Sequence, residues 1–327
     1  MDLIKEIHQF LETEINDMNK LILKNLSAEE DLLKIISTYI SKSGGKRIRP
    51  IITLLSFKIF SSIDDNRINL AAAVEFIHMA TLLHDDVVDG SKMRRFLPSA
   101  NVIWGNKASI LVGDFLFSQS FKLIVSSGSI PAMSILAKAS AMIAEGEVSQ
   151  LAKLEERRII TKDEYFKIIN AKTATLFGAA CQVGAVVTGQ PYKYSLTLKN
   201  FGRKLGNIFQ ITDDLLDYFS EVKNTGKNIG DDFCEGKVTL PIIFLAKKLP
   251  LNDKKKLINL MTSHQRVSDD FEWVKHLLTD FNIKDEIFEY LQVLKLEAKQ
   301  LLDEINIETE SKQYLKLLID FAINRDH

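Results

Sequence analysis

Proline and glycine are scarce in this chain, with six prolines and fifteen glycines among 327 residues. So few helix-breaking positions leave room for long, uninterrupted helices. The strict alternation of polar and apolar residues that marks strands is also missing, whereas apolar residues recur at spacings of three and four. The sequence therefore predicts an all-α fold.

Cysteine and excess charge are also nearly absent. The two cysteines, Cys181 and Cys234, form no paired motif, which favours a reduced compartment. The formal net charge of -1 gives no overall attraction to nucleic acid or to a membrane surface. The N-terminus lacks the features of a signal peptide, and the longest apolar runs are interrupted by Lys58, Asp114 and Lys122. We expect a cytoplasmic protein with no nucleic-acid partner and no transmembrane segment.

Several local signals organise the chain. The hydrophobic content of 46% suffices for a large core, and neither a repeat nor a linker is visible, so we expect a single domain over residues 1–327. Helix starts are predicted at Ser27 and Thr161, where Glu follows three positions later, and Pro50 suits a first helical turn. Residues 220–237 are rich in helix breakers and are either a surface insertion or a lid, and we favour the lid.

The most informative stretch reads LLHDDVVDGSKMRR and contains Asp85, Asp86 and Asp89. On a helix, spacings of three and four would let all three carboxylates point at one spot. They would repel one another unless a cation joined them, and Mg²⁺ takes oxygen ligands that it often shares with phosphate. A solvated helix end is the alternative, but the preceding helix, about residues 69–88, is apolar on nearly every side. We therefore expect the acidic end to open into a cavity.

The same spacing recurs in FQITDDLLDY, which places Asp213, Asp214 and Asp217 on a second apolar helix. Two such clusters, each followed by basic residues, are much stronger evidence than one. Holding a diphosphate through several Mg²⁺ ions requires a carboxylate cage with two sides. The pair of motifs predicts such a cage.

Basic residues supply the opposite charge. The GGKRIRP motif offers Lys46, Arg47 and Arg49 beside two glycines that permit a tight turn. His78 lies seven residues before Asp85 on about the same helix face, so it is either a satisfied core residue or a donor to phosphate. Together with the aspartates, these residues indicate a site for two polyanionic groups. The same argument extends to Arg94, Arg95, Lys172, Thr173, Lys227 and Lys237.

Together the motifs resemble those of the trans-isoprenyl diphosphate synthases. GGKRIRP, LLHDDVVDGSKMRR, KTATLFG, FQITDDLLDY and GKNIGDDFCEGKVTLP occur in that family's order and approximate spacing, over about residues 40–245. The chain looks most like the bacterial long-chain branch. The resemblance implies helices around a deep central cavity, usually in a homodimer, and extension of an allylic diphosphate by isopentenyl diphosphate with three Mg²⁺ ions. One departure is Phe96, which stands where the family commonly has Gly.

The resemblance also implies a product and a set of roles. The product would be a long polyprenyl diphosphate of octaprenyl length, made from farnesyl diphosphate for a quinone side chain, with transient membrane contact on release. Metal would be held by Asp85, Asp89 and Asp213, supported by Asp86, Asp214 and Asp217. The allylic diphosphate would contact Arg94, Lys172, Thr173, Gln210, Lys227 and Lys237. Isopentenyl diphosphate would contact Lys46, Arg49, His78 and Arg95.

Product length would depend on the space below the first aspartates. Ala80 and Thr81 lie about one turn before Asp85, and their small side chains either leave a tunnel open or merely allow close helix packing. Candidates for the floor of the tunnel are Phe117, Phe121 and Met142.

Other functions share some of these features. A terpene cyclase needs no second diphosphate site, and a non-catalytic subunit of a heteromeric synthase would tend to lose an aspartate cluster. A synthase of shorter products would keep every motif. A metal-dependent phosphohydrolase built on His84 and Asp85 leaves the second cluster unexplained. A catalytic long-chain synthase accounts for the motifs best.

Overall fold

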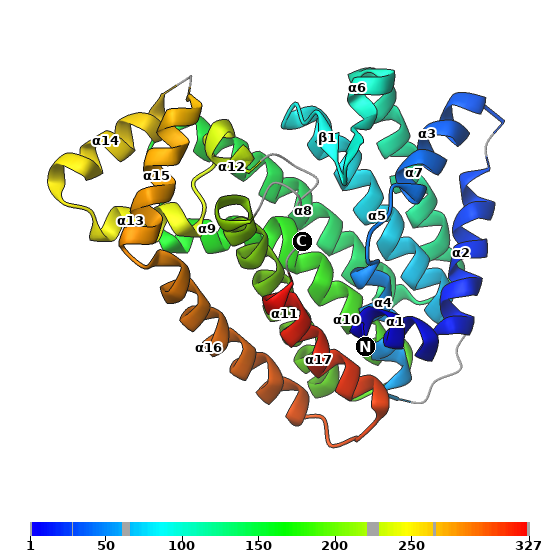
Figure 1. Ribbon diagram of the computed structural model, residues 1–327. Coiled ribbons are helices and arrows are strands. Elements are labelled where there is room, and N and C mark those ends of the chain that lie inside the picture. The colour runs from blue at the N-terminus through cyan, green and yellow to red at the C-terminus, as the bar shows by residue number, and fades with distance from the viewer. Residues whose placement is uncertain (1, 28, 61–65, 221–228, 264–265, 326–327) are drawn as a thin grey trace.

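The computed structural model describes the chain apart from residues 1, 28, 61–65, 221–228, 264–265 and 326–327 (Figure 1). Helices make up nearly all of its regular structure, which confirms the predicted all-α fold. In chain order the elements are α1 (Leu3–Phe10), α2 (Glu12–Leu26), α3 (Asp31–Lys42), α4 (Ile48–Lys58), α5 (Asn66–Val88), β1 (Met93–Arg94), β2 (Leu97–Pro98), α6 (Ala100–Trp104), α7 (Asn106–Ser126), α8 (Ile130–Glu155), α9 (Lys162–Ile169), the π-helical turn η1 (Asn170–Ala174), α10 (Thr175–Val187), α11 (Tyr192–Phe219), α12 (Asp231–Glu235), α13 (Leu240–Lys248), α14 (Leu251–Thr262), α15 (Ser268–Asp280), α16 (Ile283–Asp303) and α17 (Glu310–Asn324).

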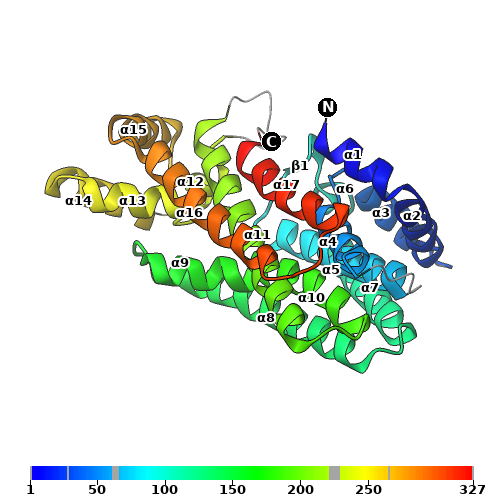
Figure 2. The ribbon, with the colours of Figure 1, turned by 90° about the horizontal axis from the view of Figure 1, so that it is seen from below.

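Two inner helices organise the bundle. Residues 70–77 of α5 are buried without a break, as the all-round apolar sequence predicts for a core helix. α5 packs against α7, α4 and α2, while α10 packs against α11, α4 and α8. α1, α2 and α3 lie at one end of the molecule and α13, α14 and α15 at the other, in both views (Figures 1 and 2).

α10 and α11 approach each other closely at Gly202. A Cβ atom on this residue would lie 2.4 Å from the carbonyl oxygen of Phe177, closer than real Cβ contacts come. Because the obstructing atom belongs to the backbone, it cannot rotate away. Gly202 therefore sets the separation of the two helices that carry the KTATLFG and second aspartate motifs.

Two of the predicted helix starts are confirmed. The Thr161 side chain accepts from the backbone N–H of Glu164, and the Glu164 side chain accepts from the N–H of Thr161, which is a complete capping box for α9. Pro50 lies in the first turn of α4, where its missing N–H breaks no helical hydrogen bond.

The helix start predicted at Ser27 is wrong. Ser27 follows the last residue of α2, and its hydroxyl donates back to the carbonyl of Lys24 at 2.5 Å. The hydroxyl is thus engaged by the helix that ends there. The next helix begins four residues later, at Asp31.

The predicted breaker-rich loop is only partly described. Residues 221–228, which include the predicted ligand Lys227, lie outside the described residues. Within the rest of the stretch, Asp231–Glu235 form the short helix α12, so this segment is more regular than its glycines suggest. Both ends of α12 are glycines in the left-handed conformation, with φ of 82° at Gly230 and 80° at Gly236.

α7 is, among the described residues, the helix that is long and apolar enough to cross a membrane. It carries Asp114 and Lys122, and 44% of its apolar window is buried inside the protein. α7 also packs along much of α5. α7 is therefore packed against the protein on one side and exposes apolar residues such as Leu111 on the other.

We predict that Gly202→Ala destabilises the protein by about 1–3 kcal/mol, because the new methyl group must push α10 and α11 apart. The free energy of unfolding in urea measures this change. Lys193→Ala, at an exposed position on the same helix, should alter stability by less than about 0.5 kcal/mol. Equal stability of the two variants would contradict the close packing described here.

Candidate active site

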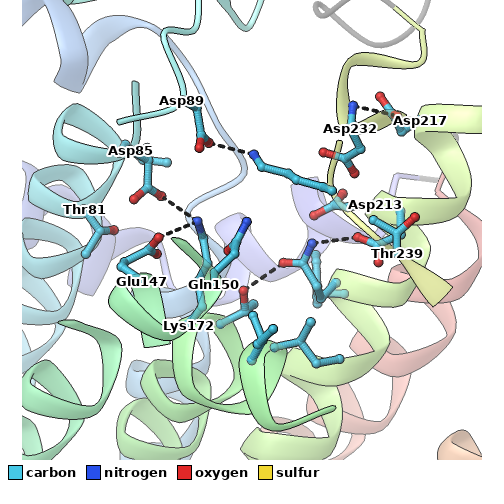
Figure 3. Close-up of a pocket in the computed structure, with 18 of the residues that line it drawn as sticks. Thr81, Asp85, Asp89, Glu147, Gln150, Lys172, Asp213, Asp217, Asp232 and Thr239 are labelled. Carbon is cyan, nitrogen blue, oxygen red and sulfur yellow. Dashed lines mark hydrogen bonds and ion pairs between the residues drawn. The ribbon is translucent and has the colours of Figure 1, made fainter. Parts of the chain in front are cut away.

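A large cavity of about 900 Å³ opens beside the aspartate motifs (Figure 3). Its walls come from α5, α8, η1 and α11 and from the segment after α12. It brings together most of the residues predicted from the sequence, namely Lys46, Arg49, His78, Thr81, Asp85, Asp89, Arg94, Arg95, Lys172, Thr173, Gln210, Asp213, Asp214, Asp217 and Lys237. The predicted cavity at the acidic end of α5 is therefore present.

The three carboxylates of the first motif do not converge. Asp85 and Asp89, one helical turn apart, line the cavity, whereas the Asp86 side chain is almost fully buried. Asp86 accepts a bidentate pair of hydrogen bonds from Arg94, from Nε to Oδ2 at 3.0 Å and from Nη2 to Oδ1 at 2.6 Å. The prediction that all three point at one spot is wrong, because adjacent residues on a helix face directions about 100° apart.

The second motif is divided in the same way. Asp214 is 2% exposed and accepts hydrogen bonds from the Tyr165 hydroxyl at 2.6 Å and from Gln210 Nε2 at 2.9 Å. Burial, together with the nearby charge of Asp232, raises the pKa of Asp214 to about 8. Asp213 and Asp217 share the cavity wall one turn apart. In each motif the first and last aspartates face the cavity, and the middle aspartate is tied into the fold.

Lysines approach the cavity carboxylates of the first motif. Lys172 Nζ lies 2.8 Å from Glu147 Oε2 and 3.8 Å from Asp85 Oδ2, and Lys237 Nζ lies 2.8 Å from Asp89 Oδ2 (Figure 3). Burial opposes the charge on Lys237, but the carboxylates around it, Asp232 first, outweigh burial and raise the pKa of Lys237. Both ammonium groups are therefore charged and available to a polyanion.

A π-helical turn positions the residues of the KTATLFG motif. η1 interrupts the path from α9 to α10 at Asn170–Ala174, and π-turns of this kind are frequent at functional sites. The Thr173 hydroxyl donates to Gln210 Oε1 at 2.8 Å, and Gln210 in turn donates to Asp214. This chain of hydrogen bonds connects η1 to the second aspartate motif.

The predicted isopentenyl diphosphate residues form a second basic region. Arg49 Nη1 lies 3.0 Å from His78 Nε2, and because a guanidinium can only donate, Nε2 of His78 accepts. Burial, reinforced by Arg49 and the neighbouring arginines, holds the pKa of His78 well below its usual value. His78 is therefore neutral, and this contact orients the guanidinium of Arg49.

A two-residue hairpin holds Arg95. β1 and β2 pair through Arg94 and Leu97, and both connecting residues have left-handed backbones, with φ of 51° at Arg95 and 66° at Phe96. The unexpected Phe96 thus occupies a conformation that glycine favours, and its side chain is 59% exposed. Arg95 donates to the carbonyl of Gly44, and a Cβ on Gly45 would lie 2.5 Å from the Arg95 guanidinium. Gly45 is therefore required for this contact.

The chain-length candidates lie in different places. Thr81 lines the cavity, and its hydroxyl donates to the His78 carbonyl at 2.8 Å. Ala80 is 1% exposed and is not part of the cavity wall. Phe117 and Phe121 stack edge to face at 4.9 Å outside the cavity, and Met142 lines a separate, smaller hollow.

Sequence reasoning missed several cavity residues. Glu147 stands beside Lys172, and Glu75, buried on α5, faces the arginines with its Oε2 unpaired. Asp232, whose N–H donates to Asp217 Oδ2 at 3.1 Å, lies within the quoted GKNIGDDF segment and could have been found there. Arg325, the residue that follows α17, also lines the cavity, and it belongs to none of the sequence motifs.

The donor set fits a hard cation that arrives with its own oxygen ligands. Among the described residues, no three acidic, histidine or cysteine side chains already form a metal-binding group. Instead, two pairs of carboxylates, Asp85 with Asp89 and Asp213 with Asp217, line one cavity. Mg²⁺ is commonly bound by one or two carboxylates plus the phosphates of a substrate, so these pairs suit it.

Comparisons with known proteins agree with this geometry. The polyprenyl synthetase family model matches residues 30–278. An octaprenyl diphosphate synthase of Haemophilus influenzae is 37% identical over 326 residues, covering 99% of this chain and 98% of its own length. One from Escherichia coli is 41% identical over 240 residues, covering 73% of this chain and 74% of its own length.

Solved structures show the same likeness. A crystal structure of a polyprenyl synthase from Caulobacter crescentus, complexed with calcium and isoprenyl diphosphate, has a TM-score of 0.93 and 36% identity. The match covers 99% of this chain and 98% of that one. The predicted resemblance and the predicted enzyme class, a trans-prenyltransferase, are confirmed. The chain belongs to the polyprenyl synthetase family.

Proposed function

We propose that this prenyltransferase extends farnesyl diphosphate with isopentenyl diphosphate to an octaprenyl diphosphate that supplies a quinone side chain. The observation that carries the proposal is the cavity itself. It has an aspartate pair from each motif on its walls and a separate arginine region around Arg49 and Arg95. Two sites for polyanions are what a reaction between two diphosphates requires, whereas a cyclase needs only one.

We propose that three Mg²⁺ ions bind the allylic diphosphate, held by Asp85, Asp89 and Asp213, with Asp217 in support. When bound, Mg²⁺ would stabilise the negative charge that develops on the departing diphosphate. The calcium and isoprenyl diphosphate in the Caulobacter structure support this proposal. Asp86 and Asp214 would act indirectly, since their hydrogen bonds fix Arg94 and Gln210.

The allylic diphosphate would replace the carboxylates as the partner of Lys172 and Lys237. Both ammonium groups face the cavity, and the partners that the described residues give them are acidic side chains, which a more highly charged diphosphate can displace. Thr173 and Gln210 would add hydrogen bonds from the π-turn side. Arg94 and Lys227 complete the proposed set, and Lys227 lies outside the described residues.

Isopentenyl diphosphate would bind Lys46, Arg49 and Arg95. His78 would act mainly by orienting Arg49, through the hydrogen bond described above. This arrangement places the second diphosphate on the α4 side of the cavity. The alkene of isopentenyl diphosphate would then meet the allylic carbon as its diphosphate leaves, and we propose that the departing diphosphate accepts the proton that the adduct loses.

We further propose that the chain is a single domain that works as a cytoplasmic homodimer. Large apolar side chains are exposed on the outer face of α7 and α8, including Leu111 at 64% and Val148 at 68%. A second copy covering this face would remove them from water. Long products bury much apolar surface, so their release would be slow and aided by transient contact with a membrane.

We predict that the purified protein, with Mg²⁺, farnesyl diphosphate and labelled isopentenyl diphosphate, yields a ladder of products that ends at octaprenyl. Asp85→Ala should lower incorporation at least about a hundredfold, because it removes charge that holds the leaving group's counter-ions. Asp17→Ala, on the exposed face of α2, is the matched control and should be fully active.

The products discriminate between the alternatives. A ladder that stops after one or two additions would indicate a shorter-chain synthase. A cyclic hydrocarbon without incorporation would favour a cyclase, and an inactive wild type that gains activity with a partner chain would favour the heteromeric subunit. Hydrolysis alone would favour a phosphohydrolase.

We predict that Thr81→Phe shortens the product, because a ring would fill the cavity one turn below Asp85. Each isoprene unit adds about five carbons, and burying them stabilises the bound product by roughly 4 kcal/mol. A product that cannot extend into a blocked tunnel would leave its added units in water and lose this stabilisation. Ala80→Phe should shorten it as well by pushing the adjacent wall inward. Thr81→Ser is the control, and an unchanged chain length in both Phe variants would overturn the tunnel assignment.

We predict that His78→Gln reduces the loss of stability in acid. The pKa of folded His78 lies below its unfolded value near 6.5, so the unfolded chain binds the proton first as pH falls. The stability that His78 contributes is therefore present above about pH 6.5 and declines below it. Between pH 7.5 and 5.5 the wild type should lose about 1 kcal/mol more than the variant in urea unfolding. Parallel pH profiles would show that folding does not lower the pKa of His78.

A further inference from the structure

The last helix of the described chain ends beside the second aspartate motif. α17 packs against α11 and α4, and Figures 1 and 2 show it running alongside α11. Arg325 follows α17 directly and lines the cavity. This places an arginine from the end of the sequence among residues from the motifs.

Arg325 contacts α11 in three ways. Its Nη2 lies 2.7 Å from Asp213 Oδ1 and 2.5 Å from the carbonyl oxygen of Phe209. Its guanidinium also lies over the Phe209 ring, 4.3 Å from the centroid. The ring and the carbonyl fix the plane of the guanidinium, so its charge is held on Asp213 in one orientation.

Burial of Arg325 is unusual for a charge at the end of a chain. Its side chain is 9% exposed, and within the described part of the chain its Nε has no hydrogen-bond partner. A desolvated guanidinium with an unused donor is an unfavourable arrangement, which a purely structural anchor would avoid. Asp213, by contrast, keeps 56% of its side chain exposed. The guanidinium of the pair is therefore buried, whereas the carboxylate is accessible to solvent.

Three cavity carboxylates thus carry a cation in the same state of the protein. Lys172 and Lys237 approach Asp85 and Asp89, and Arg325 holds Asp213. The two lysines belong to motifs at the cavity and can transfer to a diphosphate. Arg325 follows α17 and pairs with Asp213, so any divalent ion on this carboxylate meets a fixed positive charge.

We propose that Arg325 is a resident counter-cation that competes with a divalent ion for Asp213, so that metal loading at the second motif requires the end of α17 to release this carboxylate. The inference rests on the proposed role of Asp213 in holding metal. It makes Arg325 a positioning residue for metal binding, one that acts from outside every motif of the sequence.

The test measures metal binding rather than activity. Free Mn²⁺ is counted by electron paramagnetic resonance while the full-length protein is titrated with Mn²⁺ in saturating inorganic diphosphate. Arg325→Gln should bind Mn²⁺ about tenfold more tightly than the wild type, the effect of one unit charge on a divalent ion about 6 Å away in a water-like medium. Arg203→Gln, which removes the same charge from α11 three turns from Asp213, should bind as the wild type does.

Two further variants complete the test. Arg325→Met keeps an apolar stem over Phe209 and should repeat the gain, which guards against unfolding of the Gln variant. Adding Asp213→Asn to Arg325→Gln should abolish the gain, since the competition takes place at that carboxylate.

The outcomes separate this inference from the proposed function. Equal affinity in the wild type and both Arg325 variants would overturn the competition while leaving the metal cage intact. A gain that survives Asp213→Asn would place the effect elsewhere and overturn it as well. A wild type that binds no Mn²⁺ even with diphosphate would overturn both.

Discussion

Mutual repulsion between carboxylates governs how the walls of the cavity are put together. Six aspartates line the cavity, four of them the outer residues of the two motifs, and such closely spaced charges can coexist in a folded protein only if cations accompany them. The chain itself supplies cations, from η1, from the turn after α12 and from the residue that follows α17. Ion pairs thereby connect segments that are far apart in sequence around the cavity.

Helical geometry gives the aspartates of each motif two different roles. Residues four apart share a face, so the outer aspartates of each motif open to the cavity, while the middle one points into the protein. There Asp86 is paired with Arg94 and Asp214 with Tyr165 and Gln210, so each middle residue braces a neighbouring element. Each motif thus contains two aspartates that face the site and one that stabilises the fold, although the sequence alone does not distinguish the three.

Much of this could be predicted from the sequence, for physical reasons. The helical fold follows from the scarcity of helix breakers and from apolar periodicity, and the cavity follows from acids at the end of a buried helix. The directions of Asp86 and Asp214 were not predicted, because spacing gives neighbours on a helix but not the tertiary partners that select a face. Arg325 was missed because its role depends on where α17 ends, which only long-range packing decides.

The π-turn η1 has a consequence for how the chain tolerates insertions and deletions. From Lys162 to Val187 the backbone is nearly one continuous helix, and a π-turn is equivalent to one extra residue within it. That residue rotates everything after it by about 100° relative to everything before it. Deleting a single residue here would restore an ordinary helix but turn Tyr165 and the face of α10 out of register with each other. Such a deletion would hardly alter the composition or hydropathy of the chain. It would nevertheless put the two parts of the cavity wall in the wrong relative orientation.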